Sequence, residues 1–148
     1  MVVRGECRVL DGAEARAAVV AAGPYGYREV NVEAQARDPA SLLRWLTHMI
    51  HTRKRCPQIG AGRWRIIPTR NPHVVALAYA DASAGTVVSV HNFDERPHEV
   101  TLNLDAAAGD RLASLLDEDD VVAGGPGRYH VQIDALGYRW YRAQRARP

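Results

Sequence analysis

The sequence predicts a mainly β protein, an antiparallel Greek-key β-sandwich preceded by one amphipathic α-helix. From residue 61 onward apolar and polar residues alternate, which is typical of strands that bury one face. Turn-forming residues separate these runs at hairpin spacing. Upstream, between residues 38 and 57, apolar residues recur at steps of three and four, which is typical of a helix.

Residues 1–37 are expected to form an irregular N-terminal segment. The composition of residues 14–22 is compatible with a short helix, which Gly23-Pro24-Tyr25-Gly26-Tyr27 would end.

The helix is expected over residues 38–57. Asp38 is a suitable N-cap, and Pro39 fits the first helical position, where its missing N–H has no partner to lose. Pro57 ends the helix. The apolar stripe consists of Leu42, Leu43, Leu46, Met49 and Ile50. The basic residues at the negative end of the helix dipole are Arg53, Lys54 and Arg55.

Residues 61–146 are expected to form the sandwich, with about seven strands. The runs are 64–68, 73–80, 86–92, 100–104, 111–116, 129–133 and 138–142. The residues predicted to face the core are Val100, Leu102, Leu104, Val131 and Ile133. Trp64, Tyr138 and Trp140 occupy alternating strand positions, which favours a core role over sugar stacking.

Composition excludes several classes of protein. In the 148-residue chain, 47% hydrophobic residues suffice for a core, and a net charge of +2 from interspersed residues argues against nucleic-acid binding. No apolar run is long enough to span a membrane, and no signal peptide is recognisable. Cys7 and Cys56 lie far apart, so a reduced, cytoplasmic protein is expected.

The search for catalytic and metal-binding motifs gives no site. His48 and His51 lie three residues apart but have no third ligand at useful spacing. Residues 117–120 are acidic but lack the spacing of a calcium loop. No nucleophile, phosphate-binding or dinucleotide-binding motif occurs. We therefore expect no catalytic residue, metal or cofactor.

Several motifs nevertheless match one enzyme family. They are Gly-Pro-Tyr-Gly-Tyr (23–27), Val-Asn-Val-Glu-Ala-Gln (30–35), Asp-Pro-x-Ser-Leu-Leu-x-Trp (38–45), Ile-x-x-Arg-Lys-x-Cys-Pro-x-Ile-Gly (50–60), Val-His-Asn-Phe (90–93), Leu-Leu-Asp (115–117) and Gly-Tyr-Arg-Trp-Tyr-Arg (137–142). In this order they resemble the C-terminal part of the α-amylase family, glycoside hydrolase family 13, and its trehalose synthase and α-glucosidase-like members above all.

The resemblance implies that residues 38–57 correspond to the last helix of a (β/α)₈ barrel and residues 61–146 to the domain C that follows it. A barrel needs about 250 residues, so the catalytic carboxylates of the family have no counterpart in this chain. The expected function is a non-catalytic module of an enzyme acting on α-glucosides. In an intact parent, the residues expected near the substrate are Tyr25, Tyr27, Asn31 and Gln35.

The expected partner is a catalytic barrel or a second copy of the chain. Without a barrel the helix stripe lacks a cover, so we expect a homo-oligomer with an interface at Leu42, Leu46, Met49 and Ile50. The alternative is an independent sandwich that binds carbohydrate or another protein.

Overall fold

A computed structural model describes residues 23–24, 26, 30–105 and 109–145. The chain divides into two compact units, residues 1–47 and residues 48–148. The helix considered for residues 14–22 lies outside the described residues.

Three helices precede the first strand: α1 (Val32–Arg37), α2 (Leu42–Lys54) and α3 (Gln58–Ala61). The sequence predicted one. Helix α1 lies in the segment expected to be irregular, and it forms because Asn31 caps its N-terminus, with Oδ1 accepting the Ala34 N–H at 2.8 Å.

Helix α2 begins later than predicted because Ser41, not Asp38, caps it. The Ser41 carbonyl accepts the Trp45 N–H at 3.0 Å, and the Ser41 hydroxyl accepts the Arg44 N–H at 3.3 Å. Asp38 instead ends α1 and accepts the Ala40 N–H at 2.9 Å in the turn between the helices. The prediction of Asp38 as N-cap was therefore wrong, and the last turn of α2 is basic as expected.

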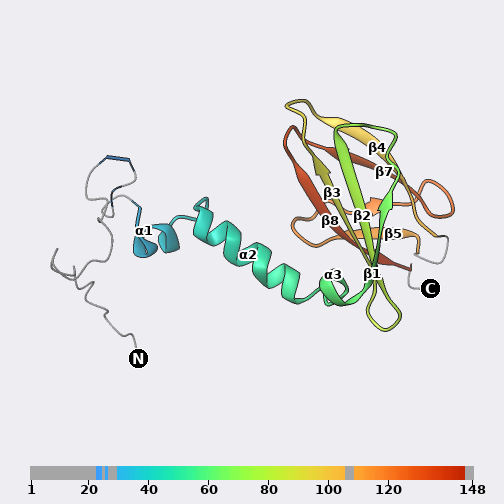
Figure 1. Cartoon of the computed structure of the whole chain (residues 1–148), viewed down its shortest axis with the longest axis horizontal. Coiled ribbons are helices and arrows are strands. Elements are labelled where there is room, and N and C mark those ends of the chain that lie inside the picture. The colour runs from blue at the N-terminus through green and yellow to red at the C-terminus, as the bar shows by residue number, and fades with distance from the viewer. Residues whose placement is uncertain (1–22, 25, 27–29, 106–108, 146–148) are drawn as a thin grey trace. The chain divides into compact units, whose positions relative to one another are not determined.

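Eight antiparallel strands form the rest of the described chain (Figure 1). They are β1 (Arg63–Ile67), β2 (Val74–Asp81), β3 (Gly85–Asn92), β4 (His98–Asn103), β5 (Arg111–Ser114), β6 (Val121–Val122), β7 (Arg128–Ile133) and β8 (Tyr138–Gln144). The alternation of apolar and polar residues did not predict β6, which is only two residues long. One sheet has the order β1-β2-β3-β8-β5-β6, and the second pairs β4 with β7.

The pairing of the last six strands is nested. Strand β3 pairs with β8, β4 pairs with β7 and β5 pairs with β6. The chain therefore leaves the large sheet for β4, returns to it for β5 and β6, enters the small sheet again as β7 and ends in the large sheet as β8. This confirms the predicted antiparallel sandwich.

The core lies between the two sheets. The five residues predicted to face inward are all buried, from fully buried Leu102 to Leu104 at 8% exposure. Across the small sheet, Leu102 is paired with Tyr129, whose hydroxyl donates to the Gly109 carbonyl at 2.6 Å. Gly109 has a φ of 126°, and a Cβ there would lie 2.0 Å from the Gln144 carbonyl oxygen, so only glycine fits.

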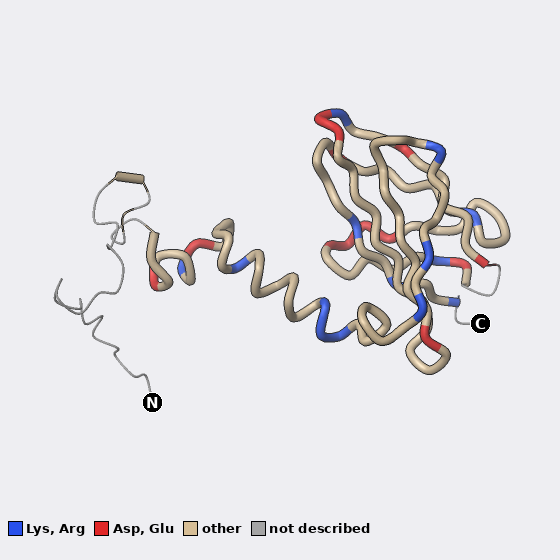
Figure 2. Tube along the Cα trace, in the orientation of Figure 1, with Lys and Arg blue, Asp and Glu red and all other residues tan. Residues whose placement is uncertain are grey.

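Charged residues are distributed along the sandwich without long runs of one sign, apart from the acidic stretch at residues 117–120 (Figure 2). Within the described part of the chain, none of the helices combines the length and apolar character that crossing a membrane requires.

Candidate functional site

The outer face of the six-stranded sheet is apolar and aromatic. Side chains alternate along a strand, so the neighbours of core residues point away from the core. The register aligns these outward residues across strands: Trp64 with Tyr79, and Ile66 with Leu77. We call this face the docking surface, which comprises Trp64, Ile66, Val75, Leu77, Tyr79, Phe93, Tyr138 and Trp140.

Three members of the docking surface are more exposed than large apolar residues usually are. The exposed fractions are 66% for Trp64, 62% for Ile66 and 68% for Phe93. Contiguous apolar side chains in water mark sites of interaction with another protein or a ligand. The docking surface is therefore the strongest candidate for a functional site in the described residues.

An aromatic stack forms one side of the docking surface. The His91 ring lies between Phe93 and Tyr138, with ring centroids 6.4 Å away on each side. Burial lowers the pKa of His91, because desolvation disfavours the imidazolium form. The histidine is consequently neutral at pH 7 and does not introduce a charge into the apolar face.

The segment that precedes β1, residues 55–62 with helix α3, covers another part of this outer face. Cys56 and Gln58 are buried, and the Gln58 amide donates to the Ala84 carbonyl. From β8, the Arg142 guanidinium donates to the Arg55 carbonyl at 3.0 Å. Gly62 permits this close approach, since a Cβ there would lie 2.7 Å from the Ala80 carbonyl oxygen. The docking surface is the part of the face that this segment leaves uncovered.

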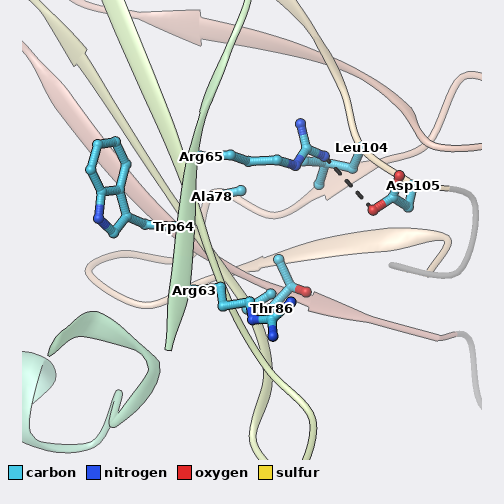
Figure 3. A pocket seen from close by; sticks show the side chains of 8 residues that line it. Arg63, Trp64, Arg65, Ala78, Thr86, Leu104 and Asp105 are labelled. Atoms are coloured by element: carbon cyan, nitrogen blue, oxygen red, sulfur yellow. Dashed lines mark ion pairs between the residues drawn. The ribbon is translucent and has the colours of Figure 1, made fainter. Parts of the chain in front are cut away.

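A groove of about 330 Å³ lies on the opposite side of β1 (Figure 3). Arg63 and Arg65 point into it, whereas Trp64, between them in sequence, points away. Arg65 pairs with Asp105 at 3.9 Å across the groove. Without a nucleophile or a second carboxylate, this arrangement has no means of hydrolysing a glycoside.

The acidic loop after β5 serves a structural role. Arg139 bonds Asp134 at 2.8 Å and lies 3.8 and 4.0 Å from Asp119 and Asp117. Burial opposes ionisation of Asp117, but the Ser114 hydroxyl, the Asp119 N–H and Arg139 outweigh it and lower its pKa. An arginine thus occupies the position that a cation would need.

Metal and acid–base chemistry find no support in the described residues. These residues contain no group of three or more His, Cys, Asp or Glu side chains arranged to hold a metal. His98 bonds Asp94 at 2.8 Å and stacks on His73, with centroids 5.7 Å apart. This cluster lowers the pKa of Asp94 and ties the loop after β3 to β4.

The predicted substrate-positioning residues are only partly described. Tyr25 and Tyr27 lie outside the described residues. Asn31 caps α1, and the Gln35 side-chain oxygen accepts the Leu43 N–H at 3.1 Å at the start of α2. Both described side chains therefore have local capping roles, and their proposed role near a substrate stays a prediction.

The placement of Trp64 in the core was wrong. The alternation along β1 was recognised, but its residues were assigned to the wrong faces. Ile67 is buried in the core, and Trp64, three residues earlier, therefore lies on the opposite, outer face. Tyr138 and Trp140 are half-buried on the same outer face rather than in the core between the sheets. Phe93, which the sequence analysis did not single out, could have been noticed as a large apolar residue directly before a charged turn.

Comparison with known proteins identifies the relatives of this fold. Residues 85–142 match the family model "Sucrose hydrolase-like, C-terminal domain". A trehalose synthase from Pimelobacter sp. (strain R48) is 31% identical over 121 residues, which cover 80% of this chain and 21% of the relative. A trehalose synthase from Thermus thermophilus is 36% identical over 121 residues, covering 80% of this chain and 12% of the relative.

Solved structures share the fold. An α-amylase from Anoxybacillus superposes with a TM-score of 0.62 at 20% identity, covering 72% of this chain and 23% of its own. A trehalulose synthase superposes with a TM-score of 0.60 at 24% identity, covering 80% and 21%.

The described residues thus form an antiparallel sandwich of the kind that the family model describes as a C-terminal domain. The chain is similar to part of the trehalose synthases and to a sucrose hydrolase-like C-terminal domain, and it shares its fold with part of the α-amylase structures. It spans about a fifth of the length of the Pimelobacter relative, and its described residues contain no catalytic barrel. The resemblance stated from the motifs is confirmed.

Proposed function

We propose that residues 61–146 form a module that packs on, and stabilises, the catalytic barrel of an enzyme acting on α-glucosides. The docking surface carries this proposal. Each Trp, Ile or Phe side chain contributes about 1.5–3 kcal/mol when it is removed from water, so the exposed members of this surface provide several kcal/mol for association. The relatives' names support the substrate class.

An independent carbohydrate-binding sandwich is the second candidate, because the exposed rings of Trp64 and Phe93 offer faces for stacking on a sugar. The aliphatic residues Ile66, Val75 and Leu77 on the same face supply no polar groups, however, and the only hydroxyl groups of the docking surface are those of Tyr79 and Tyr138. Sugar sites need hydrogen-bonding side chains beside the ring, because each hydroxyl that loses water requires a partner. The composition of the docking surface thus favours a protein partner.

The segment before α2 has its own proposed role. In an intact parent, Tyr25, Tyr27, Asn31 and Gln35 would lie on a loop at the catalytic face of the barrel, where loops of such enzymes build the pocket. Support comes from the family motifs alone. Replacing Gln35 with alanine in the intact enzyme should raise KM if it contacts the substrate, and lower only stability if it acts solely as a cap.

A chimera tests the docking role. The region of the Pimelobacter trehalose synthase that matches this chain is replaced by the chain. The thermal unfolding of this chimera is then compared with that of chimeras carrying Ile66→Ser or Phe93→Ser. Both substitutions should lower the Tm of the chimera while leaving the isolated chain nearly unchanged, because these side chains are exposed until the barrel covers them.

Thr101→Ala, on the small sheet, serves as the control and should leave the chimera as stable as its parent. Equal Tm values for the docking-surface variants and the control would contradict packing through this face. Specific binding of maltose to the isolated chain, abolished by Trp64→Ala, would instead support the carbohydrate-binding alternative.

A further inference from the structure

A polar groove of about 470 Å³ lies on the outer face of the small sheet, beside the β1–β2 loop. Its lining contains Arg70 from the loop, Glu99, Thr101 and Asn103 from β4, and Arg128 from β7. The docking surface lies on the outer face of the other sheet, so a partner bound there leaves this groove open. Nothing in the proposed module function uses these side chains.

The loop holds Arg70 in a strained conformation. Its φ is 56°, in the left-handed region that few side chains other than Asn, Asp and Gly occupy. Neighbouring hydrogen bonds enforce this geometry: the Thr69 hydroxyl accepts the Asn71 N–H at 3.3 Å and lies 2.9 Å from the Val74 carbonyl oxygen. Strain of this kind concentrates at functional sites, where the surrounding structure holds a side chain in place.

Across the groove, β4 and β7 present a matched pair of donors. Asn103 is the direct cross-strand partner of Arg128, and Thr101 is the next outward residue on β4. Neither the Arg70 nor the Arg128 guanidinium forms an ion pair or a hydrogen bond with another residue in the described ranges. Two unpaired guanidinium groups with amide and hydroxyl donors nearby match the oxygen atoms of a phosphate group.

The charge of the groove changes along β4. Glu99 lies four residues from Asn103, and its carboxylate is 3.9 Å from His130 Nδ1, which also lies 3.2 Å from the Thr101 hydroxyl. At about 3.4 Å per residue, the backbone of Glu99 lies roughly 14 Å along the strand from Asn103 and its cross-strand partner Arg128. The Glu99 end repels an anion but accepts hydrogen bonds from hydroxyl groups.

We propose that this groove binds the phosphate group of a small molecule, as free phosphate or as a phosphate ester of a polyol such as a hexose. Arg70 and Arg128 bond the phosphate oxygens, and Asn103 and Thr101 supply further donors. In the ester, the hydroxyl groups extend toward Glu99 and His130.

Titration of the full chain with inorganic phosphate, followed by NMR of backbone amides in β4 and β7, tests the site. Sodium chloride at matched ionic strength is the control for screening. Arg128→Gln should weaken binding by about tenfold, since a charge-assisted hydrogen bond is lost. Arg70→Asn should weaken it similarly while the domain stays at least as stable, because asparagine tolerates the left-handed region.

Arg63→Gln, at the other groove, is the matched control and should bind phosphate like the parent chain. A hexose phosphate that binds more tightly than phosphate, with an advantage lost in Glu99→Gln, identifies the ester as the ligand, whereas equal affinities identify free phosphate. Shifts reproduced by sodium chloride, or unchanged binding in both Arg70→Asn and Arg128→Gln, would overturn the proposal.

Discussion

Leu102→Ala is the most direct test of the sandwich core. Leu102 is fully buried among core residues from both sheets and faces Tyr129 on the neighbouring strand. Truncation of such a leucine removes its transfer free energy and leaves a cavity, which together cost about 2–5 kcal/mol. Because a domain of this size is stable by only about 5–15 kcal/mol, the variant should lose a large share of its stability.

Urea unfolding, followed by the tryptophan fluorescence of the chain, measures this loss. The slope of the transition should not change, since the surface exposed on unfolding is nearly the same, and only the midpoint should fall. Ile66→Ala is the control, because Ile66 lies on the outer face at 62% exposure and should cost less than about half a kcal/mol. A loss below half a kcal/mol for Leu102→Ala would refute the assignment of this strand face to the core.

Three further predictions concern activity, assembly and pH. The chain alone should not convert maltose, trehalose or a nitrophenyl α-glucoside above buffer, and activity that survives further purification would contradict a non-catalytic module. Light scattering should show a dimer or larger assembly held by the α2 stripe of Leu42, Leu46, Met49 and Ile50. Leu46→Glu should convert this assembly to a monomer. A parent chain that is monomeric and binds no hydrophobic dye would exclude this contact. The hydrogen bond from His98 lowers the pKa of Asp94 below its ordinary 3.8, so the ionised carboxylate stabilises the folded chain above pH 3.8. This stabilisation should be lost as the pH falls through the lowered pKa, and the loss should be smaller in His98→Ala. Urea midpoints measured between about pH 5 and 2 test this expectation.

The periodicity of the sequence predicted the core faces of β4 and β7 and the basic end of α2, which depend on residues close together in the chain. On β4 and β7 every second residue is apolar, and the alternation assigned Leu102 and Val131 to the core because only one register buries them. The basic end of α2 was predicted for a similar reason, since it depends on residues within one turn of the helix.

Features that depend on distant partners were not readable in the same way. Both faces of β1 carry large or charged side chains, so the sequence of β1 alone does not show which face is buried. The packing of Ile67 against the core residues of other strands decides it. The cap of α2 was misassigned because Asp38 and Ser41 are both good N-cap residues, and α1 makes use of the first. The groove at Arg70 and Arg128 joins residues 58 positions apart, and no local pattern links them.

The nested order of the strands has a consequence for synthesis on the ribosome. Strand β8 lies in the middle of the large sheet, between β3 and β5, although it is the last strand to emerge. Until β8 emerges, one edge of β3 is unpaired, and this edge can form hydrogen bonds with a strand of another chain. Completion of the sheet must therefore wait for residues 138–144, and a pause in translation shortly before them prolongs the period in which the nascent chain is prone to aggregate.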